Sequence, residues 1–353
     1  NSEDAEPVIP DNWRAIHDAT DPPAEPTAAL PLPLPDWDGR TDAVTLARFL
    51  RQPAATFLHG RLKVRFGELD ELAEDEPFAL DPLATHQLKS RLLEAVRDVP
   101  EAETGRHWHA AATRLPEEGG LPFGAAGAQL LQACHAPVMA LRQNWHRLDD
   151  LTDLPPLTLP PLLLPLAGDQ TATLLAHCDG LQAMAPDSPP LRRRVMRTGR
   201  LADSAGRGAD TRWIPRLHTL VGFWPAHLAL QAAGFAIPTL IVGETVTLRL
   251  APLPADEARH CLQVLAGYWR QAHGEPLPLP CKTTGVWLQQ QDASAARQAY
   301  EGGYHSTGER AESPALARLF PAFEDLDLAR LDALATDLYA PLLASVTVPE
   351  SAA

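Results

Sequence analysis

The amino-acid sequence predicts an α+β fold in which a small central sheet is flanked by helices. Apolar residues recur at helical spacing in much of the chain before residue 150 and after residue 255. Between residues 154 and 219 this spacing is absent, and glycine and proline turns divide the segment into pieces of strand length. The 353 residues, 45% of them hydrophobic, are enough to bury a substantial core.

Residues 1–40 are rich in proline, aspartate and alanine, which is typical of an extended linker. Because the chain begins in this segment without a methionine, we expect a fragment of a longer protein, with the linker joining it to a preceding domain. The folded domain is expected over residues 41–345, followed by a tail over residues 346–353.

Helices are expected in the first part of the domain wherever apolar residues share one helical face. Pro53 suits the first turn of a new helix, and Asp81-Pro82 suits a helix start with Leu88, Leu92 and Val96 on one face. Residues 68–81 hold seven acids and no base, which predicts a solvated loop. The expected helices are 46–50, 54–62, one that begins at 82, 104–115, and 125–148 with a possible kink at Pro137.

Short strands and loops are expected over residues 154–219. Two β-branched runs in 239–250, joined by Gly243-Glu244, predict a hairpin. The remaining expected helices are 217–233, 255–273, 294–301 and 326–346.

The segment 192–216 carries eight arginines and two aspartates, within a chain of net charge −15. Such a local basic segment attracts a polyanion, and we expect a DNA-contacting strand or hairpin in which Trp213 can stack on an unpaired base. The alternative is a solvated loop whose arginines pair with nearby acids. The expected DNA-binding residues are Arg192, Arg193, Arg194, Arg197, Arg200, Arg207, Arg212, Trp213 and Arg216.

Several kinds of chemistry have no sequence support. The chain has no phosphate-binding GxxxxGK[ST] loop, no GxSxG, no HExxH and no CxxC pair. His107 and His109 are two residues apart on an expected helix, so they point to different faces. We therefore expect no catalytic residue, no metal site and no cofactor. The apolar stretch 154–168 is broken by five prolines, so we expect no membrane span. The four cysteines are far apart and the N-terminus is polar and acidic, so we expect reduced thiols and a cytoplasmic protein.

Seven short motifs occur in the order found in one known family. They resemble the nuclease-like C-terminal domain of RecC-type subunits, the gamma subunits of the helicase–nuclease exodeoxyribonuclease V, over roughly residues 41–345. The motifs are Leu46–Leu58, Asp75–Asp81, His86–Leu88, Leu121–Gly127, Arg212–Arg216, Gly285–Leu288 and Ala299–Gly302.

The resemblance implies a restriction-endonuclease-like core, of the PD-(D/E)XK type, that is catalytically inactive. It places Ala202 and Ile214 where active relatives carry metal-binding carboxylates, and Arg216 where they carry a lysine. Asp203 is one residue out of register, and Gln52 replaces a cysteine that active relatives use in an iron–sulfur clasp. No Asp/Glu-x-Lys motif occurs anywhere in the chain.

The resemblance also implies a function. Subunits of this type receive a DNA end, split it with an inserted pin and pass the strands to RecB-like and RecD-like partner subunits. We therefore expect a non-catalytic DNA-guiding domain that binds forked or single-stranded ends. Two alternatives stay open: a degenerate but active magnesium-dependent nuclease, and an interaction scaffold that does not touch DNA. The segments 68–81 and 154–168 are the expected partner-docking surfaces. The alternative for 154–168 is an ordinary strand-and-loop segment that lines the domain's own core.

Overall fold

The computed structural model describes residues 33–66, 82–118, 121–122, 124–206, 211–303 and 306–348. Contacts along the chain separate the segment Asn1–Pro33 from a compact unit, Leu34–Ala353, which contains every described helix and strand. Most of the expected linker 1–40, the acidic segment 68–81 and the end of the expected tail 346–353 lie outside the described residues. The described elements confirm the α+β class.

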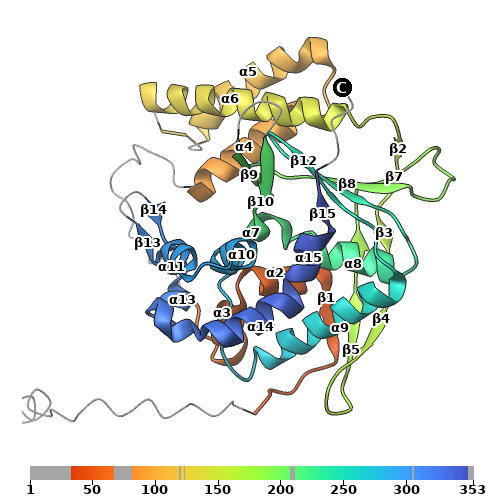
Figure 1. Cartoon of the computed structure of the whole chain (residues 1–353). Helices are drawn as coiled ribbons and strands as arrows, with labels where there is room; N and C mark the ends of the chain where they lie inside the picture. Colours follow the sequence, from red (N-terminus) through yellow and green to blue (C-terminus); the bar gives the residue numbers. More distant parts are fainter. Residues whose placement is uncertain are drawn as a thin grey trace, which may run out of the picture. The chain divides into compact units, whose positions relative to one another are not determined.

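The largest sheet has six strands (Figure 1), in the order β15 (Val346–Thr347), β12 (Thr247–Leu250), β11 (Thr239–Val242), β8 (Arg192–Met196), β7 (Leu181–Ala183) and β2 (Thr152–Asp153). β8 and β11 are parallel, whereas every other pair in this sheet is antiparallel. A parallel pair needs a crossover connection. The connection here holds a two-stranded ribbon and two helices, namely β9 (Ala202–Ala205), β10 (Arg212–Pro215), α7 (Leu217–Leu220) and α8 (Trp224–Ala232).

Smaller sheets lie mostly in the strand-rich middle of the chain that the sequence predicts. β5 (Thr171–Leu175) pairs with β1 (Arg40–Asp42) on one side and with β4 (Leu162–Pro165) on the other. Side chains alternate along these strands, so that Leu164 and Leu174 are fully buried while Leu163 is 64% exposed. Two further pairs are β3 (Leu157–Thr158) with β6 (His177–Cys178), and β13 (Gly302–Gly303) with β14 (Ser306–Thr307).

The opening helices follow the predicted pattern. The carboxylate of Asp42 accepts a hydrogen bond from the backbone N–H of Thr45 at 2.7 Å, which caps the start of α2 (Ala43–Arg51). The buried residues of α2 are Ala43, Leu46, Phe49 and Leu50. After Gln52 the chain continues as α3 (Pro53–Thr56) and a π-helix, η1 (Phe57–Arg61).

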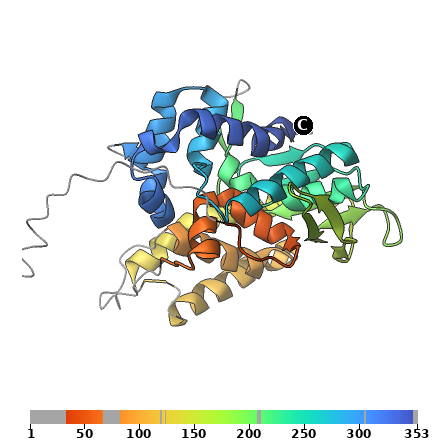
Figure 2. The same ribbon diagram turned by 90° about the horizontal axis from the view of Figure 1, so that it is seen from below.

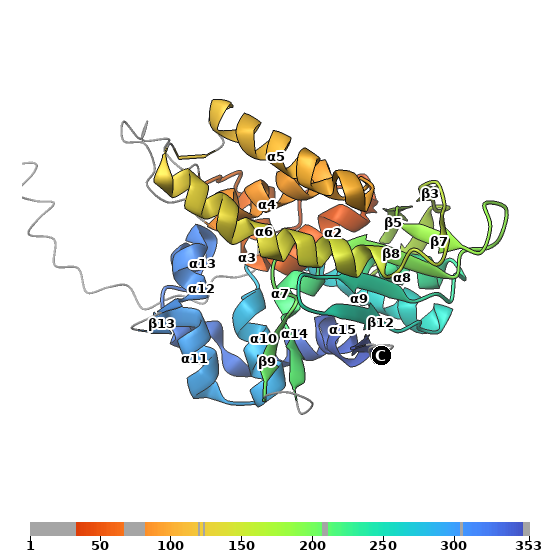
Figure 3. The ribbon, with the colours of Figure 1, turned by 90° about the horizontal axis from the view of Figure 1, so that it is seen from above.

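Three helices form a layer of their own: α4 (Pro82–Val96), α5 (Glu101–Glu117) and α6 (Ala125–His146) (Figure 3). The predicted face of α4, with Leu88, Leu92 and Val96, is buried in a separate apolar cluster. Val242 of β11 belongs to the same cluster, and Met196 of β8 packs against it. The layer of α4, α5 and α6 therefore packs against the six-stranded sheet.

The C-terminal part of the unit is helical, with α9 (Ala255–Gln271), α10 (Cys281–Gln290), α11 (Ala293–Glu301), α12 (Glu309–Glu312), α13 (Pro314–Leu319), a 3-10 turn η3 (Phe323–Leu326), α14 (Leu328–Leu338) and α15 (Ala340–Ser345). α13 contacts α3, and α10 contacts α7. Figure 2 shows these C-terminal helices (blue) next to the opening helices (red-orange). Segments from both ends of the unit thus meet around the arginine-rich region.

Some predicted boundaries are wrong for clear physical reasons. The expected helix 217–233 is two helices, because Pro225 occupies the first turn of a new helix, α8. The expected helix 326–346 is divided in two at Tyr339, where Pro341 in the first turn of α15 lacks the N–H that would continue α14. The first residues of the expected tail form β15, an edge strand.

Candidate nucleic-acid interface: a basic cleft

Arg192, Arg193 and Arg194 lie on β8, which is an inner strand of the six-stranded sheet and not an arm of an exposed hairpin. Their side chains are only 13%, 7% and 3% exposed. Arg192 donates hydrogen bonds to Gln182 at 2.8 Å and to Asp150 at 2.5 Å, and the bonds from Arg192 lower the pKa of Asp150. The guanidinium of Arg192 is therefore occupied by partners within its own chain.

Arg193 and Arg194 are held in the same way. Arg193 donates to Asp179 at 2.8 Å. Arg194 donates to Asp149 at 2.6 Å, and its guanidinium lies 3.8 Å from the centroid of the Trp145 ring. All three guanidinium groups of β8 are paired and largely buried. Of the predicted DNA-binding arginines, only those that follow β8 can therefore contact DNA.

The chain that follows β8 forms one wall of a basic cleft with a volume of about 660 Å³. Arg197 and Arg200 come from this wall, Arg51 from the end of α2, and Lys89 from α4. Arg216, directly after β10, is the fifth cation. No aspartate or glutamate is found among the described residues that line the cleft. The basic cleft thus gathers cations that are distant in the sequence.

The cations of the basic cleft differ in how they are paired. Lys89 forms an ion pair of 2.9 Å with Glu244, which also accepts a hydrogen bond from the backbone N–H of Gly199 at 2.8 Å. Arg216 donates to both oxygens of Asp203, at 2.9 and 2.5 Å. Within the described part of the chain, the side chains of Arg51, Arg197 and Arg200 have no ion pair with a carboxylate.

Two histidines report the positive potential in the basic cleft. Burial, together with the nearby cations Lys282 and Arg51, lowers the pKa of His218 to about 3. Burial also lowers the pKa of His86, with Arg197 as the next cause. Both effects disfavour a further positive charge, so both imidazoles are neutral at pH 7. An anion would experience the opposite effect and be attracted.

The positions that the resemblance assigns to lost catalytic groups lie on the ribbon β9–β10. Ala202 is buried at the start of β9, and Ile214 of β10 is opposite Asp203. Asp203 is held by Arg216, as described above. Nowhere in the described ranges do three or more His, Cys, Asp or Glu side chains gather as a metal site would require. His107 lies instead beside Glu103, at 3.6 Å.

The other predicted DNA-binding residues have mixed positions. Arg212 is exposed on β10, whereas Trp213 is partly buried against the main core. Arg207 lies outside the described residues. Sequence reasoning missed Arg51 and Lys89, because nothing in their local sequence shows that they meet the arginine segment.

No described helix is both long and apolar enough to cross a membrane.

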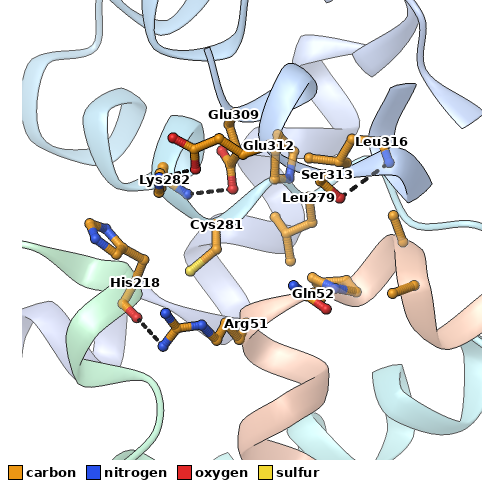
Figure 4. A pocket seen from close by; sticks show the side chains of 14 residues that line it. Arg51, Gln52, His218, Leu279, Cys281, Lys282, Glu309, Glu312, Ser313 and Leu316 are labelled. Carbon is orange, nitrogen blue, oxygen red and sulfur yellow. Dashed lines mark hydrogen bonds and ion pairs between the residues drawn. The ribbon is translucent and has the colours of Figure 1, made fainter. Parts of the chain in front are cut away.

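A small pocket of about 160 Å³ adjoins the basic cleft and shares Arg51 and His218 with it (Figure 4). Gln52 and the buried thiol of Cys281 also line this small pocket. Glu309, which is buried, accepts hydrogen bonds from the backbone N–H groups of Lys282 and Thr283 and so caps α10. The small pocket therefore lies where the opening helices meet the C-terminal helices.

A concave surface lined by several guanidinium groups is of the kind by which proteins bind nucleic-acid phosphates. A family model described as the RecC C-terminal domain matches residues 40–292, which is more than half of the chain. The chain therefore belongs to the RecC C-terminal domain family, and the resemblance drawn from the motifs is confirmed. The last motif, Ala299–Gly302, lies beyond the matched range.

One curated relative is the RecBCD enzyme subunit RecC of Escherichia coli (strain K12). It is 28% identical over 309 residues, and the match covers 79% of this chain but 23% of the relative. The chain thus spans less than a quarter of the length of this relative.

Proposed function

We propose that this chain is a non-catalytic DNA-guiding domain of a RecBCD-type helicase–nuclease subunit, which acts on the ends of double-strand breaks and helps to separate the strands. The basic cleft is the observation that carries the proposal. Its guanidinium groups would contact phosphates, which position a nucleic acid without reading its sequence. Membership in the RecC family supports the same function, since the relative is named as a subunit of the RecBCD enzyme.

We also propose that the core is related to restriction-endonuclease-like nucleases but has no hydrolytic activity. A metal-dependent nuclease needs clustered carboxylates to hold its metal ion. The nearby carboxylates are engaged otherwise, Asp203 with Arg216 and Glu244 with Lys89. These pairings favour a non-catalytic domain over a degenerate nuclease, and no contact in the described residues favours the nuclease.

The proposed domain is slightly longer than residues 41–345. Trp37 packs edge-on against Trp269 with ring centroids 5.4 Å apart, and β15 adds Val346 and Thr347 to the sheet. We propose that RecB-like and RecD-like subunits are its partners and that the setting is cytoplasmic.

The segment 154–168 contributes to the core as well as to the surface. Leu159 and Leu164 are buried, whereas Leu163 is 64% exposed and Leu175 of the neighbouring strand is 43% exposed. We propose that Leu163 contacts a partner subunit. A deletion would remove core residues, so the test is Leu163→Ser. Co-purification with the RecB-like subunit of the same organism should fall, while the unfolding midpoint stays that of the parent chain. Unchanged co-purification would exclude Leu163 from the interface.

Two assays on the 353-residue chain test the function. Fluorescence anisotropy with forked and blunt duplexes at low salt should show saturable binding to both. Absence of binding would favour an interaction scaffold that does not touch DNA. Incubation of linear DNA with Mg²⁺ or Mn²⁺ should leave the DNA intact. Degradation that is lost in Asp203→Ala would establish a degenerate nuclease instead.

A further inference from the structure

Two arginines of the basic cleft, Arg51 and Arg197, have no carboxylate partner within the described ranges. They are 146 positions apart in the sequence, one at the end of α2 and the other directly after β8, and both line the same cleft. Arg197 is half-buried, and its side chain has no hydrogen bond or ion pair within the described ranges. A partly desolvated guanidinium without an acceptor is costly unless a ligand supplies one.

Arg51 is held in place without being neutralised. Its Nη1 donates to the backbone carbonyl of His218 at 3.2 Å, as Figure 4 shows. The two carboxylates that share the small pocket with Arg51 are occupied. Glu309 caps α10, and Glu312 pairs with Lys282. The carbonyl of His218 therefore orients the Arg51 guanidinium and leaves its full positive charge available.

The two unneutralised guanidinium groups act on each other. Burial lowers the pKa of Arg197, and the charge of Arg51 is the next cause. Such mutual repulsion is relieved when an anion binds between the two groups. Lys89 and Arg216, by contrast, each have a carboxylate partner. Arg51 and Arg200 are both exposed, but Arg51 is fixed by the carbonyl of His218, whereas the side chain of Arg200 has no hydrogen bond within the described ranges.

We propose that Arg51 and Arg197 form a binding site for a phosphate monoester, the group found at the end of a phosphorylated nucleic-acid strand and in free phosphate. The inference rests on the proposed DNA-binding role of the basic cleft and names the chemical group that the cleft prefers. An internal phosphodiester carries one negative charge, whereas a phosphate monoester carries about 1.5 to 2 at pH 7. Two arginines without carboxylate partners match the monoester better.

The dimensions of the cleft agree with a terminal group. Its volume of about 660 Å³ lies within the range of about 300–1,000 Å³ that small-molecule sites occupy. Guanidinium groups can also bind phosphate oxygens through two parallel hydrogen bonds each. A strand end can therefore enter the cleft and be held by its terminal phosphate.

The test compares three single strands of one sequence that differ only at their ends: a 5′-phosphate, a 3′-phosphate, or hydroxyl groups at both. Their binding to the 353-residue chain is measured by competition anisotropy at fixed salt. Binding of inorganic phosphate alone is measured by isothermal titration calorimetry. Both measurements are repeated on Arg51→Ala, Arg197→Ala and the conservative Arg197→Lys. The matched control is Arg106→Ala, which removes an arginine of α5 that is 74% exposed.

A phosphorylated end should bind about tenfold more tightly than the hydroxyl-ended strand, the order of one charge-assisted contact. Arg51→Ala and Arg197→Ala should abolish this preference, Arg197→Lys should retain part of it, and Arg106→Ala should retain all of it. Which end is preferred identifies the strand polarity. Equal binding of all three strands, or a preference that survives in both alanine variants, would overturn the proposal.

The inorganic phosphate arm separates this proposal from the wider function. If no strand binds but phosphate binds and the Arg197→Ala variant abolishes that binding, the monoester site stands and the DNA-guiding role fails. If strands bind without any preference and phosphate does not bind, the DNA-guiding role stands and the monoester site fails.

Discussion

The guanidinium of Arg194 lies 3.8 Å from the centroid of the Trp145 ring and donates at 2.6 Å to Asp149. A cation held between an indole and a carboxylate, in a side chain that is 3% exposed, stabilises the contact between β8 and the end of α6. Part of the most basic segment of the chain therefore stabilises the fold, whereas Arg197, Arg200 and Arg216 line the basic cleft.

Replacing Arg194 by alanine should lower the free energy of unfolding by about 3 kcal/mol, because Asp149 loses its guanidinium partner and keeps only the contact with His146. This is the lower end for a broken buried pair, since Asp149 also keeps contact with water. Urea denaturation measures the loss. Arg200→Ala, at an exposed position, should change the stability by less than about 0.5 kcal/mol. If Arg194→Ala kept the stability of the parent chain but bound DNA more weakly, Arg194 would have to contact DNA.

Gly180 lies before β7 with φ of 68°, and a Cβ there would lie 2.1 Å from the carbonyl oxygen of Arg194. Gly168 has a similar φ of 70° but open space around it. Gly168→Ala should cost about 1–2 kcal/mol, the cost of the left-handed backbone alone. Gly180→Ala should cost clearly more, because β7 must also move away from β8. Equal losses in thermal or urea unfolding would show that the close approach is not needed.

The buried imidazole of His227 should make stability depend on pH. Its Nε2–H donates to the carbonyl of Ala251 at 3.0 Å, and its Nδ1 accepts from the hydroxyl of Thr239 at 2.9 Å. Burial lowers the pKa of His227 from 6.5 to about 4. The unfolded chain therefore binds this proton first as the pH falls. Stability is fully present above pH 6.5 and declines towards pH 4, by about 3 kcal/mol for this group.

Urea unfolding at pH 7 and pH 5 measures this decline, and His227→Gln should make it smaller. A residual decline is expected in the variant, because the pKa of His218 is lowered in the same direction. A pH dependence of the same size in His227→Gln would show that other groups cause it.

Asp203→Asn should strengthen DNA binding. The change frees Arg216, and since the pair is partly exposed, at 33% and 50%, the stability should change by less than about 1 kcal/mol. The dissociation constant for a forked duplex should fall several-fold at low salt, and the gain should vanish at high salt. The matched control is Asp256→Asn, which frees Arg259 on α9. Unchanged affinity in Asp203→Asn would place Arg216 outside the DNA path.

Structural features that depend on residues close together in the sequence were predicted from local patterns. The face of α4 and the break at Gln52-Pro53 follow from apolar spacing and proline chemistry, so both were found. The helix α10 was not predicted, because its start is capped by Glu309, whose carboxylate lies 26–27 positions further along the chain.

The candidate site was predicted only in part for a similar reason. Whether an arginine is a surface group depends on acids that the fold brings near it, and Asp149, Asp150 and Asp179 are 14 to 45 residues away from their partners on β8. The convergence of Arg51 on Arg197 depends on the packing of α2 beside the crossover after β8. No local pattern could show it.

The salt dependence of forked-DNA binding tests the central claim most directly. Anisotropy titrations over a range of salt should give a steep slope of log affinity against log salt for the parent chain. Replacing Arg51, Arg197 and Arg200 together by alanine should reduce the slope by about 2 to 3, close to one unit for each phosphate that the variant no longer neutralises. The control replaces the exposed arginines Arg106, Arg114 and Arg259, which removes the same charge elsewhere and should leave the slope nearly unchanged. Equal slopes for the two triple variants would contradict a DNA path through the basic cleft.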